Sequence, residues 1–500
     1  MLAHFEDESS GSIASRYRWS QPNPDTFPRL DASEANYCRR GKSASGERRP
    51  MMRRLVVLGA VGDLATRHLL PALAHLHSRG ELPPGFSVGG VGRERMTTQD
   101  YRLLAASRLA THASSVEPAV RDALISSLNY VHADLAQEPD LREALGGGRV
   151  VAYLALPPSV YPAALRALKA SHLAAGSRIV VEKPFGEDLS SGRELTRLLH
   201  AVVDERDVFR VDHFLYHQAV QDLLALRFSG PVFEPLWTGE HIERVDIVWE
   251  ETATVGGRVD FYDRTGALRD MVQSHLLQLL ALVAMEPPAA FDERCVRDEK
   301  ADVLRRVRSL TPSEVSTTTM RGRYTAGSIS GSSVPGYLEE PGVDRSRATE
   351  TYASLQLVVD LPRWRHVPFF LRTGKACGRP RRRISVQFRE ARERALPSRP
   401  AVVCLDMIPD LITLRVQAAG PDGLPEVEPL VLSSARPQQL LPPSARMLRD
   451  VLAGDPTLMV RDDEAEQSWR IVDSVLATWR TGVPDLRDYP AGSHGPGPFR

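Results

Sequence analysis

The chain has 500 residues, 42% of them hydrophobic and 25% charged, a composition typical of a globular protein long enough for two domains. Its 63 basic and 63 acidic residues cancel, so no global charge favours binding to nucleic acid or to an anionic membrane. No apolar run approaches the roughly 20 residues of a membrane-spanning helix. The four cysteines lie far apart without a CxxC pair, which argues against a disulfide framework or a zinc knuckle. We therefore expect a cytoplasmic protein that binds neither nucleic acid nor membrane.

Residues 1–50 are rich in Ser, Arg, Pro and Asp and show no sustained hydrophobic periodicity. Such a segment buries too little apolar surface to offset the entropy of ordering it. We expect it to be disordered or a non-native extension, with translation starting at Met51 as one hypothesis. Order is predicted to begin at "MMRRLVVLGAVGDL".

Short apolar strands alternate with helical stretches over residues 51–211. The strand candidates are "RRLVVLG", "FSVGGVGR", "RVVAYLALP" and "SRIVVEKPF", and the helices between them include "PPSVYPAALRALKASHL" and "DLSSGRELTRLLHAVV". This alternation predicts an α/β dinucleotide-binding domain with a parallel, doubly wound sheet.

The pattern changes over residues 212–489. The helix "QAVQDLLALRF", the strand "IERVDIVWEE" and the long helix "ALRDMVQSHLLQLLALVAM" are followed by alternating segments such as "RRRISVQF". These features predict a separate α+β domain with a sizeable, mainly antiparallel sheet, in which the substrate binds. Residues 490–500 are predicted to form a frayed tail.

A candidate nucleotide loop follows the first strand. Gly59, Gly62 and Ala65 form a GxxGxxA pattern between a strand and a helix, where small residues bring backbone N–H groups toward a diphosphate. An ordinary glycine turn is the alternative. The second strand ends at Arg93, an arginine where many NAD sites carry an acidic residue, with Arg95 as a weaker second candidate. An arginine here suits a 2′-phosphate and so favours NADP, although a solvated basic turn would look the same.

A second group of candidates lies at strand ends and on the long helix. Glu182 and Lys183 end a buried strand, at the sheet edge where ligands bind in open α/β folds. Lys183 there can add positive charge where an alkoxide develops, or it can simply extend from the strand end into solvent. His275 is either a packed helix histidine or a general base, and Asp212 is a candidate to orient it from across the domain junction.

The stretch "FRVDHFLYHQ" carries a possible histidine pair. His213 and His217 are four residues apart and would share one face of a helix, as metal-binding histidines often do. No glutamate or third ligand lies at a supporting spacing, so we predict no metal site here.

Successive blocks of the sequence resemble the glucose-6-phosphate dehydrogenase family. They occur in family order from about residue 52 to 480: "GAVGDLATRHLLPAL", "YLALPPSVY", "EKPFG", "FRVDHFL", "GALRDMVQSHLLQLLALVAMEPP", "VRDEKADVLR", "PFFLRTGKA" and "VRDDEAEQSWRI". The resemblance implies a Rossmann-type coenzyme domain and an α+β domain with a large mixed sheet. It also implies assembly through that sheet, as a homodimer or homotetramer.

The resemblance implies a reaction as well. The hydroxyl at C1 of glucose 6-phosphate would lose its proton to a histidine while C1 passes hydride to NADP, which gives a 6-phosphogluconolactone. His275 would be the base, Asp212 its partner, and Lys183 a contact to both substrate and coenzyme. The matching positions for the sugar phosphate are Lys183, His213, His217, Glu251, Asp270 and Lys375. The matching positions for the coenzyme are Gly59, Gly62, Asp63, Leu64, Arg93 and Lys183.

Several positions depart from the family pattern. The motif commonly reads R-I-D-H-Y-L-G-K-E, and here Phe214 replaces the tyrosine and His217 replaces the lysine. Pro380 interrupts the basic residues after Lys375, and Val61 stands where a hydroxyl residue is common. An unperturbed histidine has a pKa near 6.5. If His217 binds the phosphate as a cation, affinity for glucose 6-phosphate should weaken as pH rises from about 6 to 8.

These departures leave alternatives open. One alternative is an NADP-dependent dehydrogenase of another aldose or sugar phosphate, and the other is an NADP-binding paralogue that is weakly active or acts by association. A related family of shorter sugar oxidoreductases also places "EKP" after a strand, but it lacks the paired "VDH" and "QSHLLQ" blocks.

Overall fold

The computed structural model describes residues 49–390, 395–396, 399–435 and 440–497, which belong to one compact unit. The predicted disorder of residues 1–50 therefore concerns a segment that lies, apart from its last two residues, outside the described part. Within the described part, no helix has both the length and the apolar composition to cross a membrane.

The first half of the described chain forms a parallel sheet, as predicted. Its six strands there follow the order β3-β2-β1-β4-β5-β6, with every neighbouring pair parallel. This is the order of a dinucleotide-binding Rossmann fold, in which the ligand crosses the sheet edge between β1 and β4. The strands are β1 (Arg54–Leu58), β2 (Ser87–Gly92), β3 (Leu128–His132), β4 (Val151–Leu154), β5 (Arg178–Glu182) and β6 (Val208–Val211).

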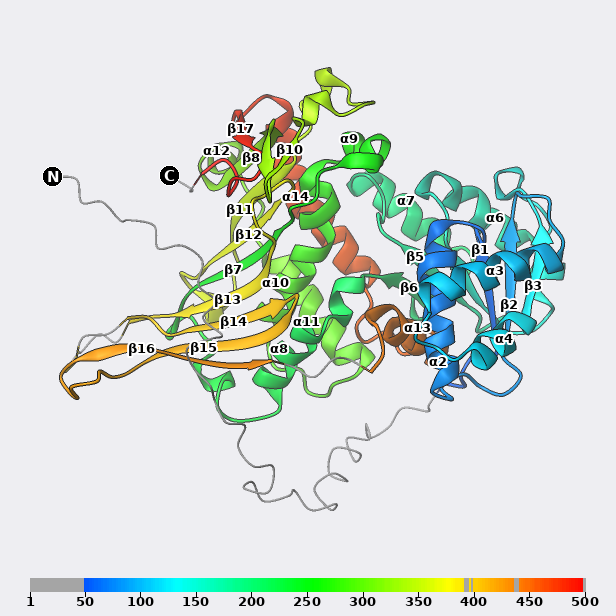
Figure 1. Cartoon of the computed structure of the whole chain (residues 1–500), viewed down its shortest axis with the longest axis horizontal. Helices are drawn as coiled ribbons and strands as arrows, with labels where there is room; N and C mark the ends of the chain where they lie inside the picture. Colours follow the sequence, from blue (N-terminus) through cyan, green and yellow to red (C-terminus); the bar gives the residue numbers. More distant parts are fainter. Residues whose placement is uncertain (1–48, 391–394, 397–398, 436–439, 498–500) are drawn as a thin grey trace, which may run out of the picture. The chain divides into compact units, whose positions relative to one another are not determined.

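Helices connect these strands and lie beside the sheet in Figure 1. Strands β1, β4 and β5 are buried along nearly their whole length, as expected when helices cover both faces of a parallel sheet. Capping boxes start two of the helices, Thr97 with Asp100 at α3 and Asp188 with Ser191 at α7. The helical segments are η3 (Ala65–Leu69), α2 (Leu70–Ser78), α3 (Thr98–His112), α4 (Pro118–Ser126), η4 (Leu135–Gln137), α5 (Arg142–Leu145), η5 (Pro158–Val160), α6 (Tyr161–Ala170), α7 (Leu189–His200) and η6 (Glu205–Asp207).

The second half is built on a larger mixed sheet. Within the described residues its nine strands follow the order β16-β15-β14-β13-β7-β12-β11-β8-β17. The β7–β12 and β8–β17 pairs are parallel and the others antiparallel, which confirms the predicted α+β architecture. The strands are β7 (Ile242–Glu250), β8 (Thr319–Thr325), β11 (Tyr352–Val358), β12 (Pro368–Gly374), β13 (Arg381–Phe388), β14 (Val402–Met407), β15 (Asp410–Ala419), β16 (Val427–Ala435) and β17 (Leu486–Pro490), with a separate hairpin of β9 (Gly327–Ile329) and β10 (Ser332–Val334).

Helices pack on this sheet and on one another. Helix α8 lies on β14 (Figure 1), and the π-helical segment η10 packs on β12. The segments are η7 (His213–Tyr216), α8 (Gln218–Phe228), η8 (Glu234–Leu236), η9 (Gly256–Arg258), α9 (Val259–Ala267), η10 (Leu268–Leu276), α10 (Leu277–Ala284), α11 (Glu293–Arg306), α12 (Pro312–Thr318), η11 (Tyr337–Glu339), η12 (Arg345–Arg347), η13 (Pro362–Trp364), α13 (Pro443–Ala453) and α14 (Asp462–Arg480).

The start of η10 depends on one glycine. Gly266 has φ +71°, and a Cβ there would lie 2.4 Å from Oε1 of the buried Glu350. That same Oε1 accepts a 3.0 Å hydrogen bond from the backbone N–H of Leu268. Only glycine fits this close approach, which turns the chain between α9 and η10 and fixes where η10 begins.

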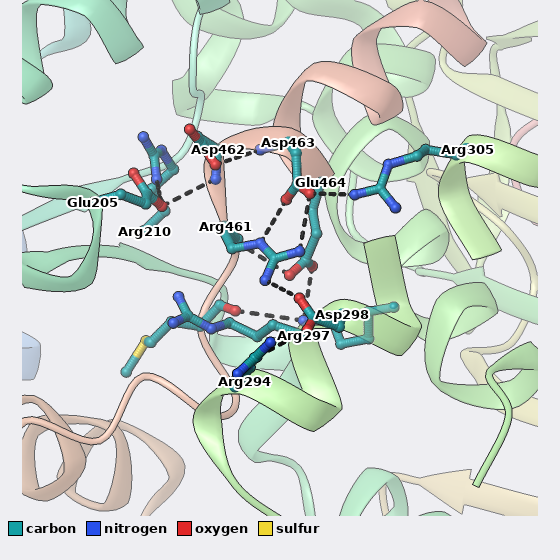
Figure 2. A network of polar contacts seen from close by, with 12 residues as sticks. Glu205, Arg210, Arg294, Arg297, Asp298, Arg305, Arg461, Asp462, Asp463 and Glu464 are labelled. Atoms are coloured by element: carbon teal, nitrogen blue, oxygen red, sulfur yellow. Dashed lines mark hydrogen bonds and ion pairs between the residues drawn. The ribbon is translucent and has the colours of Figure 1, made fainter. Parts of the chain in front are cut away.

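A polar network joins β6 to the start of α14 (Figure 2). The backbone N–H of Val460 donates to the carbonyl of Arg210 at 3.0 Å. The buried Arg210 guanidinium lies 2.6 Å from Glu205 Oε1, and that oxygen also accepts from the backbone N–H of Asp462 at 3.1 Å. Because Arg210 lies two residues before Asp212, these contacts fix the strand end that leads to the predicted orienting residue.

The same network extends to α11. Arg461 bonds Asp298 at 2.6 Å and Asp463 at 2.8 Å (Figure 2). Lys300 Nζ lies 2.9 Å from Glu464 Oε2, and both of these side chains are 0% exposed. Two of the sequence blocks quoted above, "VRDEKADVLR" and "VRDDEAEQSWRI", therefore act together, since they supply the two sides of this junction.

The expectation of a frayed tail from residue 490 is wrong for its first part. Strand β17 ends at Pro490, and Ala491 is buried. Gly492 donates a backbone hydrogen bond to the Ala376 carbonyl, and Ser493 accepts one from Gly378, both at 2.8 Å. A Cβ on Gly378 would lie 2.1 Å from the Gly492 carbonyl oxygen, so glycine lets these two backbone segments approach.

Candidate active site

Asp212 and His275 form a buried pair. Asp212 follows β6 directly and caps η7, where its Oδ1 accepts from the backbone N–H of Phe214 at 3.0 Å. His275 lies near the end of η10, and its Nδ1 is 2.6 Å from Asp212 Oδ1. The carboxylate can only accept, so we assign the proton of the neutral ring to Nδ1. The other nitrogen, Nε2, is then left as the basic site.

The surroundings of this pair keep the ring neutral. Burial lowers the pKa of His275, while the Asp212 carboxylate works in the opposite direction. Burial works to raise the pKa of Asp212, but the contacts to His275 and to the Phe214 N–H bring it below its ordinary value. At pH 7 the pair is thus a neutral imidazole beside a carboxylate, the protonation state a general base requires.

Lys183 lies next to this pair. It follows β5, the neighbour of β6, so Lys183 and Asp212 emerge at the same edge of the sheet. Its Nζ donates to the Asp270 carbonyl at 2.6 Å and to Asp270 Oδ1 at 3.1 Å. Asp270 and His275 are five apart in η10, the separation that the i→i+5 bonds of a π-helix join. The Lys183 charge is near enough to lower the pKa of His275.

Glu251 and Lys375 complete this side of the site. They follow the parallel neighbours β7 and β12, and Lys375 Nζ lies 2.8 Å from Glu251 Oε2. Burial works to raise the pKa of Glu251, but the Lys375 charge prevails and lowers it. Lys375 also helps to lower the pKa of Asp270. The two strand ends therefore bring this ion pair beside the Lys183–Asp270 pair.

His213 faces a carboxylate to which sequence reasoning assigned no role. Its Nε2 lies 3.1 Å from Glu182 Oε1, an oxygen that also accepts from the Tyr153 hydroxyl. Burial opposes protonation of His213, but Glu182 prevails and raises its pKa. A charged residue at the end of a buried strand was the available signal for Glu182, because such a group needs a partner.

His217 behaves differently from the expectation. Burial lowers the pKa of His217 to about 4, and the nearby charges of Arg382 and Arg446 add to this effect against the opposing charge of Asp212. In the free protein the ring is therefore neutral throughout pH 6 to 8. The expected titration of His217 in that range is corrected, because the sequence did not show how deeply the ring is buried.

Phe214, which replaces the family tyrosine, is part of an aromatic stack. Its ring lies 3.7 Å from the His275 ring at an interplanar angle of 6°, and 4.1 Å from the Trp249 ring. The His217 ring lies 5.9 Å from Trp249. The stack holds the base from one face, while Asp212 holds its edge. Trp249 was not predicted from the sequence, because only the register of β7 places its ring beside Phe214.

The predicted coenzyme residues lie at the switch point of the parallel sheet. Gly59 has φ +92°, and a Cβ on it would lie 2.2 Å from the Ala155 carbonyl oxygen beyond β4, so the turn requires glycine. Gly62 donates to the Gly59 carbonyl at 3.1 Å, and the partly exposed Leu64 follows at the start of the helical segment. This tight turn before a helix fits a dinucleotide diphosphate.

Two charged members of the coenzyme set, Arg93 and Asp63, are exposed. Arg93 directly follows β2, and its side chain is 81% exposed with Glu94 at 3.7 Å. Asp63 is largely exposed and pairs with Arg67 at 3.1 Å. A free guanidinium at the end of β2 can reach a 2′-phosphate, although Glu94 beside it reduces the net positive charge there.

Two family models cover nearly all of the described chain. The model described as glucose-6-phosphate dehydrogenase, NAD binding domain, matches residues 56–222. The model described as glucose-6-phosphate dehydrogenase, C-terminal domain, matches residues 224–499.

Known relatives and solved structures agree with these models. The glucose-6-phosphate 1-dehydrogenase of Treponema pallidum is 37% identical over 471 residues, which covers 88% of this chain and 92% of the relative. That of Gluconobacter oxydans is 37% identical over 460 residues, covering 88% and 94%. A structure of glucose-6-phosphate dehydrogenase in complex with its substrate glucose-6-phosphate superposes with a TM-score of 0.82 at 28% identity, covering 90% of this chain and 97% of that one. The structure of the Mycobacterium avium enzyme gives 0.78 at 33% identity, covering 90% and 96%.

The matched residues span the coenzyme loop, the Asp212–His275 pair and the large mixed sheet. The chain therefore belongs to the glucose-6-phosphate dehydrogenase family.

Proposed function

We propose that this protein oxidises glucose 6-phosphate at C1 with NADP, giving 6-phosphogluconolactone and NADPH, the entry step of the oxidative pentose phosphate pathway. The observation that carries the proposal is the 2.6 Å contact between His275 Nδ1 and Asp212 Oδ1 in a buried site. A buried histidine held by a buried carboxylate is suited to abstract a proton. Relatives named glucose-6-phosphate 1-dehydrogenase match nearly the whole described chain.

The chain's own residues account for the proton. His275 Nε2 takes the proton of the C1 hydroxyl, and Asp212 stabilises the imidazolium that results. Lys183 adds positive charge beside the oxygen that is losing its proton. Glu251, Asp270 and Lys375 are the groups that orient the sugar hydroxyls. When bound, NADP supplies the acceptor for the hydride that leaves C1.

The coenzyme is assigned to the turn at the switch point. Gly59, Gly62, Asp63 and Leu64 would hold the diphosphate end, and Arg93 would contact the 2′-phosphate of the adenosine ribose. Comparison of kcat/KM for NADP and NAD tests this assignment. An Arg93→Ala variant should lose preference for NADP while its kcat with NAD stays unchanged.

The sugar phosphate group is assigned to the η7 side of the site. His213, whose pKa is raised by Glu182 against burial, is available as a cation, and its Nδ1 is the ring nitrogen not facing Glu182. His217 is the second assigned contact and offers a neutral imidazole.

The organisation of the chain completes the proposal. We assign residues 51–211 to the coenzyme and residues 212–489 to the substrate and to self-association. Strand β16 exposes Leu430, Val431 and Leu432 at 41%, 56% and 51%, which supports a homodimer or homotetramer formed through this sheet. Sedimentation analysis tests the assembly. We place the protein in the cytoplasm.

Initial rates of NADPH formation with a panel of aldoses and sugar phosphates test the activity. We expect glucose 6-phosphate to give the highest kcat/KM. His275→Asn should lower kcat by about 10³-fold to 10⁴-fold while glucose 6-phosphate still binds, since general-base catalysis contributes at this scale. A higher kcat/KM with another sugar phosphate would replace the proposed substrate. Coenzyme binding without turnover of any sugar would reject the enzyme.

A further inference from the structure

We propose that Arg382 contacts the phosphate group of the sugar phosphate and supplies a permanent positive charge in the place where the family motif carries a lysine at position 217. This inference rests on the proposed function. The two are tested separately, because the function concerns the unaltered protein and the inference concerns one side chain.

The sheet register directs Arg382 toward the site. Arg382 on β13 pairs with Trp249 on β7, and cross-strand partners point to the same face of a sheet. Trp249 is the residue whose ring lies 4.1 Å from the Phe214 ring. The neighbours Arg381 and Arg383 alternate to the other face, where they pair with Glu250 at 3.5 Å and Asp406 at 2.6 Å.

Ring contacts link the base to Arg382. The His275 ring stacks on Phe214 at an interplanar angle of 6°, and the Trp249 ring contacts Phe214 at a tilt of 44°. The Arg382 guanidinium carbon lies 5.0 Å from the Trp249 ring centroid, a cation–π distance. Two rings therefore stand between the catalytic base and Arg382 along this series of contacts, so Arg382 is placed to meet a group of the sugar other than C1.

The guanidinium keeps donors for a ligand. Its one ion pair among the described residues is a loose 3.5 Å contact to Glu251 Oε1, while Glu251 Oε2 is held by Lys375 at 2.8 Å. Its Nε is buried without a hydrogen-bond partner in the described part of the chain, and about a quarter of the side chain is exposed, so a ligand would meet the terminal nitrogens and not Nε. A guanidinium has five N–H donors and binds phosphate oxygens in pairs.

Arg382 and His217 share one locality. Both contact the Trp249 ring, at 5.0 Å for the Arg382 guanidinium and 5.9 Å for the His217 ring. The titratable groups that act on the pKa of His217 are Asp212, Arg382, His275 and Arg446. Burial is the largest cause that lowers the pKa of His217, and the Arg382 charge adds to it. The imidazole is neutral at pH 7, whereas an arginine stays protonated at every working pH.

Arg446 has a different role. It donates to the carbonyl of Tyr216 and bonds Gln221 Oε1 at 3.1 Å, so it supports the backbone beside His217. Its other electrostatic neighbours are Arg449, Asp450, Tyr216 and Asp410. We therefore assign the phosphate contact to Arg382.

Steady-state kinetics of Arg382→Ala at pH 7.5 test the inference, with glucose 6-phosphate and unphosphorylated glucose as paired substrates. We expect KM for glucose 6-phosphate to rise by about 10-fold to 100-fold, the loss of one charge-assisted contact, with kcat within about threefold. The kcat/KM for glucose and the KM for NADP should stay unchanged. Arg383→Ala is the matched control, because it removes the same charge from the same strand on the opposite face.

Adding a lysine at position 217 sharpens the test. The double variant His217→Lys/Arg382→Ala should regain most of the affinity for glucose 6-phosphate, since a second cation then stands in the same locality. Calorimetric titration with glucose 6-phosphate measures the affinity directly and does not depend on turnover.

Three results would overturn the inference. An unchanged KM and Kd for glucose 6-phosphate in Arg382→Ala would exclude a phosphate contact. An equal fall of kcat/KM for glucose and glucose 6-phosphate would show that Arg382 only holds Glu251 and Trp249 in place. Failure of the unaltered protein to bind or oxidise glucose 6-phosphate would remove the proposed function, and this inference with it.

Discussion

The two sides of the Phe214 ring differ in how far they keep the family pattern. On the His275 side, every predicted polar residue is present, the Asp212–His275 contact is 2.6 Å, and the Lys183–Asp270 ion pair is 3.1 Å. On the Trp249 side, Phe214 and His217 have replaced a tyrosine and a lysine. The comparison teaches that the chemistry at C1 needs a fixed constellation, whereas a remote phosphate can be held by any cation that reaches it.

The largest effect is expected from a substitution of Asp212 on the His275 side. Asp212→Asn should lower kcat by about 10²-fold to 10⁴-fold, because the base loses the carboxylate that orients it and stabilises its charge. The pH profile gives the sign. Burial lowers the pKa of His275 from its ordinary value, so kcat/KM of the unaltered enzyme falls as the pH drops below this lowered pKa. Asp212 raises this pKa, so the variant's acid limb should move to still lower pH.

Binding measurements distinguish a fall in kcat caused by a disturbed site from one caused by impaired general-base catalysis. In Asp212→Asn the dissociation constants for NADP and glucose 6-phosphate should stay within about threefold, since a general base contributes to the rate and not to ground-state binding. An acid limb at the same pH as in the unaltered enzyme would show that His275 is not the titrating base.

A second prediction concerns the polar network between β6, α11 and α14, which positions Asp212 on the His275 side. Lys300→Met should lower the free energy of unfolding by about 3–5 kcal/mol, because it leaves the fully buried Glu464 carboxylate without its partner. Urea denaturation measures the change. Lys300→Met/Glu464→Gln should recover part of it.

The matched control lies in the same network. Arg305 pairs with Asp463 at 2.6 Å with about half of its side chain exposed. Arg305→Met should therefore cost less than about 1 kcal/mol. Equal losses in Lys300→Met and Arg305→Met would contradict the burial argument.

The smallest effect is expected from restoring the lysine of the family motif at position 217, on the Trp249 side. His217→Lys should lower KM for glucose 6-phosphate by about threefold to tenfold with little change in kcat, because the phosphate is remote from C1. Desolvation of the buried ammonium limits the gain. KM measured with glucose 6-phosphate and NADP checks it, and an unchanged KM would show that position 217 does not face the phosphate.

The contribution of His217 to KM should not depend on pH near neutrality, because burial lowers the pKa of His217 to about 4. The ratio of KM values for His217→Ala and the unaltered enzyme should be constant from pH 6 to 8. His213, with its raised pKa, contributes equally to both and cancels in the ratio. A ratio that falls toward one as pH rises would restore His217 as a cationic ligand.

The sequence allowed most of the fold to be predicted for a physical reason. Parallel strands buried on both faces read as apolar runs, and the glycine pattern at Gly59 follows from a close backbone approach. Residue type made Asp212 a candidate to orient His275, and the resemblance then implied their pairing. Periodicity alone left His275 open between a packed helix histidine and a general base, since its neighbours on η10 are buried.

What could not be predicted depends on register and burial. The place of Arg382 follows from its pairing with Trp249, and two arginines beside it in sequence face the other way. The neutrality of His217 follows from burial by residues distant in the chain. The tail after β17 was expected to fray because its contacts, to Ala376 and Gly378, lie more than a hundred residues earlier in the chain.

The central claim is that the Trp249 side of Phe214 still recognises a phosphate group, while the His275 side performs the oxidation. The ratio of kcat/KM for glucose 6-phosphate to that for glucose, measured on the unaltered protein with NADP at pH 7.5, tests it most directly. Two charge-assisted contacts to the phosphate predict a ratio of at least about 10². A ratio near one would contradict the account, since it would mean that no cation on the Trp249 side reaches the phosphate.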